Sequence, residues 1–119
     1  MNEYQEQLLE HYHNPKNFGE PSFTPTNSAK VTNLSCGDEL EVWLKINTDG
    51  LIEDISFTGE GCSISIATAS LLYDTLKGKN IDYIKTLNED FAVDLIGIPL
   101  TISRIKCAAL SVDALKKSL

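Results

Sequence analysis

FTGEGCSISIATAS, residues 57–70, is the stretch where a strand gives way to a helix and around which the chain is organised. A strand-like run ends at Gly59 and Gly61, Cys62 follows at once, and small residues then continue as in a closely packed helix. Glycine lets another group approach the backbone closely. Free N–H groups and the dipole at a helix N-terminus stabilise a thiolate. We therefore expect Cys62 to lie at a helix start, in a site that other segments complete.

An antiparallel sheet is predicted before this stretch. Residues 39–46 alternate apolar and polar side chains, as a half-buried strand does. Residues 48–50, Thr-Asp-Gly, predict a hairpin turn because Asp-Gly tolerates positive φ, and residues 51–58 then return as a strand. With a short strand over residues 29–34, these segments predict a three-stranded antiparallel meander with one face covered.

The other segments predict helices on that covered face. An N-terminal helix follows from the apolar repeat at Tyr4, Leu8 and Tyr12, and residues 14–28 should form a loop. The predicted helices span residues 2–13, 63–77, 80–86, 88–96 and 103–117. Strands followed by helices indicate an α+β fold, with one domain over residues 1–119 and a long C-terminal helix.

Composition excludes several classes of partner. A net charge of −7 argues against nucleic acid and anionic membranes. No apolar run approaches the ~18 residues that indicate a membrane span. The acidic N-terminus does not resemble a signal or transit peptide. The expectation is a cytoplasmic protein with no nucleic-acid or membrane partner.

The chain has three cysteines, and no two have the C-x-x-C spacing. Cysteines of cytosolic chains are rarely in structural disulfides, so buried fillers, metal ligands and reactive thiols are the alternatives. Cys36 and Asp38 flank Gly37 in a predicted tight turn, which can direct a thiolate and a carboxylate toward one centre. The alternative is that Asp38 is an ordinary turn residue and Cys36 an exposed cysteine.

Cys107 is expected near the start of the last helix, in a context of small residues like that of Cys62. Arg104 and Lys106 add positive charge that favours its thiolate form. At about 100° per residue, Cys107 should lie off the apolar stripe of the helix. That stripe consists of Ile105, Ala108, Val112 and Leu115.

Three thiolates and one carboxylate are a sufficient ligand set for tetrahedral zinc, and thiolates also suit iron–sulfur clusters. A carboxylate in place of a fourth thiolate makes such a site more labile. Lability is a disadvantage for an electron carrier and an advantage for a protein that gives its cargo away.

Four motifs occur in an order typical of a known family: HYHNPKNFG at 11–19, CGD at 36–38, GCSISIATAS at 61–70 and RIKC at 104–107. With these motifs the chain resembles the IscU/SufU/NifU N-terminal family of iron–sulfur cluster assembly proteins. The resemblance implies an α+β fold with a surface site of Cys36, Asp38, Cys62 and Cys107. In the family, this site accepts sulfur from a cysteine desulfurase and holds a nascent [2Fe–2S] cluster or a zinc ion.

Departures from the family patterns place the chain between two branches. Lys106 stands where IscU-type members have histidine, and LTISR at 100–104 replaces the LPPVK segment read by a dedicated chaperone, so that partnership is not expected. The GEGCSIS run and the Lys-Cys pair resemble SufU-type members. Those members carry an extra segment before the last helix, and residues 78–104 leave no room for it.

Three functional hypotheses result. The first is a scaffold that takes sulfur from a desulfurase, with Cys36 and Cys107 as candidate acceptors, and passes a labile cluster to apo iron–sulfur proteins. A cluster shared between two chains would make it a homo-oligomer. The second is a SufU-like zinc-dependent sulfurtransferase partner of the desulfurase, with Cys36 as acceptor and Lys106 supporting the thiolate of Cys107. The third is an acidic interaction domain whose cysteines bind no metal.

Overall fold

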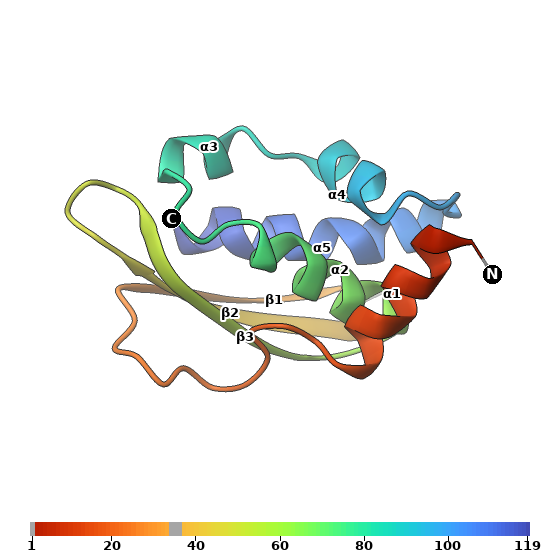
Figure 1. Ribbon diagram of the computed structural model, residues 1–119, viewed down its shortest axis with the longest axis horizontal. Helices are drawn as coiled ribbons and strands as arrows, with labels where there is room; N and C mark the ends of the chain where they lie inside the picture. The colour runs from red at the N-terminus through yellow and green to blue at the C-terminus, as the bar shows by residue number, and fades with distance from the viewer. Residues whose placement is uncertain (1, 34–36) are drawn as a thin grey trace.

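The computed structural model describes residues 2–33 and 37–119. Within these ranges the chain forms three strands and five helices (Figure 1), which confirms the predicted α+β fold. The elements are α1 (Glu3–His13), β1 (Asn27–Asn33), β2 (Asp38–Ile46), β3 (Ile52–Glu60), α2 (Ser63–Asp74), α3 (Ile81–Lys85), α4 (Glu89–Ile96) and α5 (Ile102–Ser118).

The strands pair antiparallel in the order β1-β2-β3, as the meander prediction required. β3 extends two residues beyond the predicted strand and includes Gly59. A Cβ on Gly59 would lie 2.6 Å from the carbonyl oxygen of Glu39 and 2.5 Å from the Leu40 side chain. The glycine is therefore needed where β3 passes close to β2 just before the helix.

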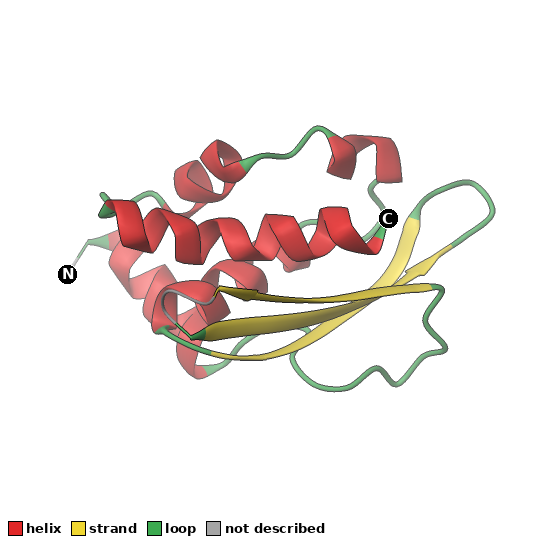
Figure 2. Cartoon of the chain, turned by 180° about the vertical axis from the view of Figure 1, so that it is seen from behind, coloured by secondary structure: helices red, strands yellow, loops and turns green. Residues whose placement is uncertain are grey.

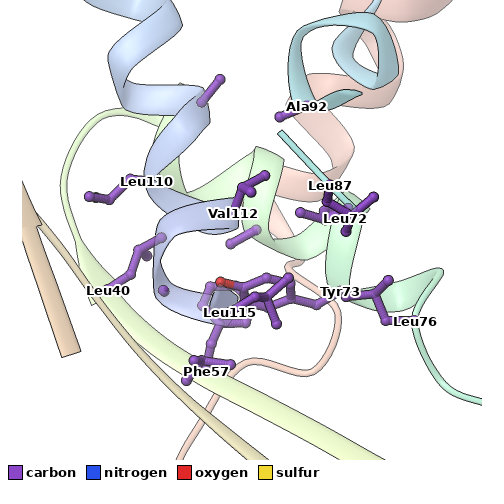
Figure 3. Close-up of a cluster of buried hydrophobic side chains, with 14 of the residues drawn as sticks. Leu40, Phe57, Leu72, Tyr73, Leu76, Leu87, Ala92, Leu110, Val112 and Leu115 are labelled. Carbon is purple, nitrogen blue, oxygen red and sulfur yellow. The ribbon is translucent and has the colours of Figure 1, made fainter. Parts of the chain in front are cut away.

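The helices α2 to α5 lie on one side of the sheet (Figure 2), with α5 across β1 and β2 and α2 beside β3, and α1 lies against α2 at the end of the sheet. The side chains on the covered face of the sheet meet those of α2, α4 and α5 in a single apolar cluster (Figure 3). Tyr73 of α2 lies fully buried in this cluster, with its ring edge-on to Phe57. Its hydroxyl donates a hydrogen bond to the carbonyl oxygen of Ser111 in α5 at 2.8 Å, which joins the two helices above the sheet.

α2 ends at Asp74, three residues before the predicted end. The N–H of Thr75 donates to the carbonyl oxygen of Leu72, so the last turn tightens. Gly78 adopts a positive φ of 84°, and its N–H donates to the carbonyl oxygen of Ile52. The chain therefore leaves the helix early because it bonds to the start of β3.

α1 begins with a capping box, in which Asn2 and Gln5 each accept from the other's backbone N–H. The expected apolar stripe is only partly covered: Leu8 is half-buried, whereas Tyr4 and Tyr12 remain 50% and 39% exposed. The stripe prediction was therefore wrong for the two tyrosines. α1 lies against α2 at the rim of the helical layer.

The predicted loop before β1 covers an edge of the sheet. The N–H of Phe57 donates to the carbonyl oxygen of Asn17, and the N–H of Gly19 donates to that of Phe57. This short pairing occupies part of the free edge of β3, where unpaired backbone groups would otherwise invite association. In the described ranges, none of the helices is both long and apolar enough to cross a membrane.

Candidate metal centre

One end of the sheet collects the predicted site residues. β2 begins at Asp38 and β3 ends at Glu60, and the antiparallel register pairs Glu39 with Glu60, so these two strand ends are adjacent. Two residues separate the end of β3 from the start of α2, and the first turns of α5 lie at the same end of the sheet (Figure 1). The topology therefore brings residues 38, 62 and 107 together from three separate parts of the chain.

The ligand atoms of Asp38, Cys62 and Cys107 all lie within 4.8 Å of one another. Zinc bonds of about 2.3 Å to sulfur and about 2.0–2.2 Å to oxygen place the donors of a tetrahedral site about 3.5–3.8 Å apart. Shifts of about 1 Å would close the observed set around an ion of that size. One carboxylate and two thiols thus form a donor set that fits such a metal. Cys36, the fourth predicted ligand, lies outside the described residues.

Asp38 is buried, with 2% of its surface exposed, although it follows a turn. Gly37, with a φ of 73°, makes that turn and donates its N–H to the carbonyl oxygen of Asn33. The Asp38 carboxylate points inward, where Oδ1 accepts from the backbone N–H of Cys62 at 3.1 Å and Oδ2 accepts from the hydroxyl of Ser65. An ordinary turn aspartate would face solvent, so that alternative does not describe this residue.

Gly61 makes the room that the Asp38 carboxylate occupies. A Cβ on Gly61 would lie 2.4 Å from Oδ1 and 2.6 Å from Cγ of Asp38, and the φ of Gly61 is 154°. The expected close approach to this glycine is therefore confirmed, and the approaching group is the Asp38 carboxylate.

Cys62 is the N-cap residue of α2, which confirms its predicted place at a helix start. It is half-buried, and its Sγ lies 3.6 Å from Oδ2 of Asp38. The N–H that Cys62 donates to Asp38 is one of the groups that a helix start leaves without a partner inside the helix. The carboxylate therefore also stabilises the first turn of α2.

Cys107 lies near the start of α5, as expected, but the prediction that it lies off the buried face of this helix was wrong. Cys107 lies in the second turn of α5, is only 3% exposed and belongs to the apolar core. The error arose because a narrow stripe was assumed, whereas the sheet, α2 and α4 all pack on α5 and bury residues 107–112 without interruption. Ile105, which was assigned to the stripe, is only half-buried. Cys107 is thus a core residue that also reaches the site.

An open hollow of about 410 Å³ gives access to the three ligands, and it is lined by Asp38, Gly61, Cys62, Ser103, Arg104 and Cys107. Arg104 therefore brings positive charge beside the thiols. Lys106 lines a neighbouring hollow of about 480 Å³, together with Glu89 and Asp113. Of the two predicted cations, only Arg104 lines the hollow that holds the ligands, and the supporting role of Lys106 stays a prediction.

The model of the family described as "NifU-like N terminal domain" matches residues 3–119. The chain belongs to this family. Its similarity to curated relatives extends over nearly its full length. The chain is 35% identical to the iron–sulfur cluster assembly scaffold protein IscU of Escherichia coli K12 over 119 residues, which covers 98% of this chain and 91% of the relative.

A second branch of relatives is similarly close. The zinc-dependent sulfurtransferase SufU of Bacillus subtilis is 34% identical, with 96% of this chain and 87% of the relative covered. The aligned region spans 131 positions, which exceeds the 119 residues of this chain, so SufU carries residues that have no counterpart here. This agrees with the shorter segment expected from the sequence.

Solved structures confirm the NifU-like fold. A SUF-system scaffold from Fervidobacterium islandicum superposes with a TM-score of 0.77 at 21% identity, covering 99% of this chain and 95% of that structure. A NifU-like N-terminal protein from Brucella abortus gives a TM-score of 0.75 at 20% identity, with 97% and 90% covered. At these identities the likeness concerns the fold alone.

Ser65 is the part of this NifU-like site that was not predicted from the sequence. It is fully buried, and its hydroxyl donates to Asp38. The position of Ser65, three residues after the N-cap Cys62, could have indicated this role, because a side chain at that position can turn back toward the helix start. Only the packing of β2 against α2 shows which group that side chain meets.

Proposed function

We propose that this protein is an iron–sulfur cluster assembly scaffold, which accepts sulfur from a cysteine desulfurase and holds a labile [2Fe–2S] cluster for transfer to apo iron–sulfur proteins. One observation carries the proposal: Asp38, Cys62 and Cys107 place their ligand atoms within 4.8 Å at an open hollow. The scaffold relatives, at about the same chain length, support it.

The ligand chemistry favours a cargo that is released again. The two thiols supply soft ligands of the kind that iron–sulfur clusters use, and Cys36, two residues before Asp38, is the proposed third. The Asp38 carboxylate supplies a harder ligand. It already accepts hydrogen bonds from the start of α2, so after release of the metal or cluster the carboxylate still has hydrogen-bond donors. We assign lability of the bound cargo to this residue.

The sulfur acceptor must be a cysteine whose Sγ an incoming persulfide can reach. Cys36 and Cys107 were the predicted candidates, and Cys107 is 3% exposed, so an incoming persulfide could reach its Sγ only after local movement. We therefore assign first acceptance of sulfur to Cys36. Arg104, at the rim of the hollow, would offset the negative charge of the thiolates, and Lys106 would add positive charge beyond Cys107.

A zinc-dependent sulfurtransferase partner of the desulfurase is the second candidate. The same three residues fit zinc, and the SufU relative is zinc-dependent by name. Bound zinc would keep the cysteines deprotonated. Both functions use the same ligands, so measurement of what the site carries and releases distinguishes them.

Anaerobic reconstitution tests the scaffold proposal. The protein is incubated with ferrous iron, cysteine, a catalytic amount of desulfurase and dithiothreitol, which reduces the persulfide sulfur to sulfide, and then with an apo-ferredoxin. We expect the absorption spectrum of a [2Fe–2S] cluster, transfer of that cluster to the ferredoxin, and loss of both in Cys62→Ser. Size-exclusion chromatography of the loaded protein shows whether two chains share the cluster.

Other outcomes support the alternatives. Zinc bound in the purified protein, with stimulation of desulfurase turnover that Cys36→Ala abolishes and with no transferable cluster, would favour the sulfurtransferase partner. A melting temperature that responds to neither zinc nor chelator would favour a metal-free interaction domain, because a ligand bound only by the native state must stabilise it.

A further inference from the structure

The Ser65 hydroxyl is fully buried between two of the proposed ligands. It donates a hydrogen bond to Oδ2 of Asp38 and lies 3.7 Å from Sγ of Cys62. Because water cannot reach this position, another donor would be needed to replace the hydroxyl if it were removed.

Two other buried hydroxyls, those of Thr68 in α2 and Ser111 in α5, bond within their own helix. Thr68 donates to the carbonyl oxygen of Ile64, and Ser111 donates to that of Ala108. Such back-bonding is the usual arrangement for serine and threonine inside helices. Ser65 instead bonds to a different element, the first residue of β2.

The Asp38 carboxylate is held on several sides. The N–H of Cys62 donates to Oδ1, the hydroxyl of Ser65 donates to Oδ2, and the backbone of Gly61 lies against Oδ1 and Cγ. With both oxygens anchored, the carboxylate is kept in one orientation, facing the two sulfur atoms. Removal of the Ser65 bond would leave the Cys62 thiol, whose Sγ lies 3.6 Å away, as a weaker hydrogen-bond donor to Oδ2 and would hold the carboxylate less firmly in this orientation.

We propose that Ser65 is a positioning residue: its hydroxyl orients the Asp38 carboxylate for metal binding and thereby raises the affinity of the site. This inference rests on the proposed function, since it requires that Asp38 be a ligand. Hydrogen bonds that orient a ligand are worth about 10–100-fold in metal affinity in characterised metal sites.

The test measures zinc affinity by competition with a chromophoric chelator and ligand geometry by the absorption spectrum of the cobalt(II) form. We expect Ser65→Ala to bind zinc about 10–100-fold more weakly than wild type and to show shifted cobalt bands. Ser111→Ala, which deletes an equally buried hydroxyl that bonds within α5, is the matched control and should bind as wild type does.

A double variant shows whether Ser65 acts through Asp38. On an Asp38→Ala background, Ser65→Ala should have no further effect on zinc affinity. An equal loss on both backgrounds would overturn the inference. Where Ser65→Ala fails to fold, Ser65→Thr and Ser65→Val compare a hydroxyl with a methyl group at nearly equal volume, and we expect tighter zinc binding by the threonine variant. Equal affinities in that pair would also overturn it.

Failure of this inference and failure of the proposed function give different results. Wild-type protein that binds neither zinc nor cobalt would overturn the proposed metal site itself. Wild-type protein that binds cobalt with sulfur-to-metal charge-transfer bands, together with a Ser65→Ala variant of equal or higher affinity, would overturn the role of Ser65 and leave the site intact.

Discussion

The carboxylate of Asp38 packs directly on the backbone of Gly61, where a Cβ would lie 2.4 Å from Oδ1. Asp38 opens β2, and Gly61 joins β3 to α2. This contact holds a buried carboxylate beside Cys62, whose N–H donates to the same oxygen. The glycine between strand and helix therefore positions a proposed ligand on a neighbouring strand.

Gly61→Ala should displace Asp38 and weaken zinc binding at least tenfold, because the new methyl group and the carboxylate cannot occupy the same space. Zinc titration with a competing chelator measures the loss. Gly78→Ala is the control: Gly78 also has positive φ, but a Cβ there meets no atom within 4 Å among the described residues. It should cost about 1–2 kcal/mol of stability from backbone strain and leave zinc affinity unchanged. Equal zinc affinities for both variants would contradict this role of Gly61.

Asp38→Ala should lengthen the lifetime of a reconstituted cluster, because it removes the ligand to which we assign lability. It should also lower the stability of the metal-free protein, because the N–H of Cys62 and the hydroxyl of Ser65 lose a buried acceptor. Decay of the cluster absorbance under a chelator measures the first effect, and urea unfolding of the metal-free protein measures the second.

If Ser65 acts through Asp38, Ser65→Ala should change cluster lifetime in the same direction as Asp38→Ala. Zinc affinity should fall in both variants, since an equilibrium affinity and the lifetime of a cluster are separate quantities. A cluster that decays from Asp38→Ala as fast as from wild type would contradict the assigned lability.

Arg104→Gln should impair zinc binding more than Lys106→Gln does. The Arg104 side chain lines the hollow that holds the ligands, whereas Lys106 lines the neighbouring hollow with Glu89 and Asp113. The nearer cation stabilises the negatively charged thiolates more strongly, so its loss disfavours the thiolate form of the ligands more. Zinc affinity at low and at moderate ionic strength measures the difference, which should shrink as salt screens the charges. A larger effect of Lys106→Gln would instead be evidence that Lys106 stabilises the thiolate of Cys107, as predicted.

The folded protein should lose stability as the pH falls, because His11 becomes protonated more readily in the unfolded chain. Burial lowers the pKa of His11, an effect that Asp74 partly opposes and Lys16 reinforces. The Ser70 hydroxyl lies 2.7 Å from Nδ1 and accepts from the N–H of Lys16, so its own proton is available to a neutral imidazole.

Above its ordinary pKa of about 6.5, His11 is neutral in both the folded and the unfolded chain. As the pH falls below that value, the unfolded chain takes up the proton first, so stability is lost toward the lower pKa of the folded state. Urea unfolding between pH 8 and pH 5 should show this slope in wild type and in His13→Gln, and a smaller slope in His11→Gln. The same slope in all three proteins would contradict the assignment.

Local sequence rules located most of the elements correctly. The helices predicted over residues 80–86 and 88–96 are present as α3 and α4, with Asn80 and Asn88 as their N-caps. An asparagine side chain accepts from N–H groups two or three residues on, whatever the helix later packs against. Alternation predicted β2 because period two is a property of an extended chain with one covered face. The Asp-Gly turn that follows β2 predicted the return of the chain as β3. The placement of Cys62 before a helix likewise depended on adjacent residues alone.

Burial depended on partners that lie far away in the sequence. Cys107 was expected off the apolar stripe, yet it is buried, because the sheet, α2 and α4 all pack on α5. Tyr4 and Tyr12 fitted an apolar stripe, yet they are exposed, because α1 lies at the rim of the helical layer. Helical periodicity shows which residues share a face, and it does not show how many neighbours will cover that face.

The sequence by itself determined the order of strands and helices, the helix starts, and the residue types able to hold a metal, because each depends on neighbouring residues. Only the tertiary structure decided that Asp38 is buried against Gly61 and that the Ser65 hydroxyl holds it. Those contacts exist because antiparallel pairing brings the start of β2 to the end of β3, where α2 begins. A hydrogen bond between residues 27 positions apart depends on that pairing and has no local signature.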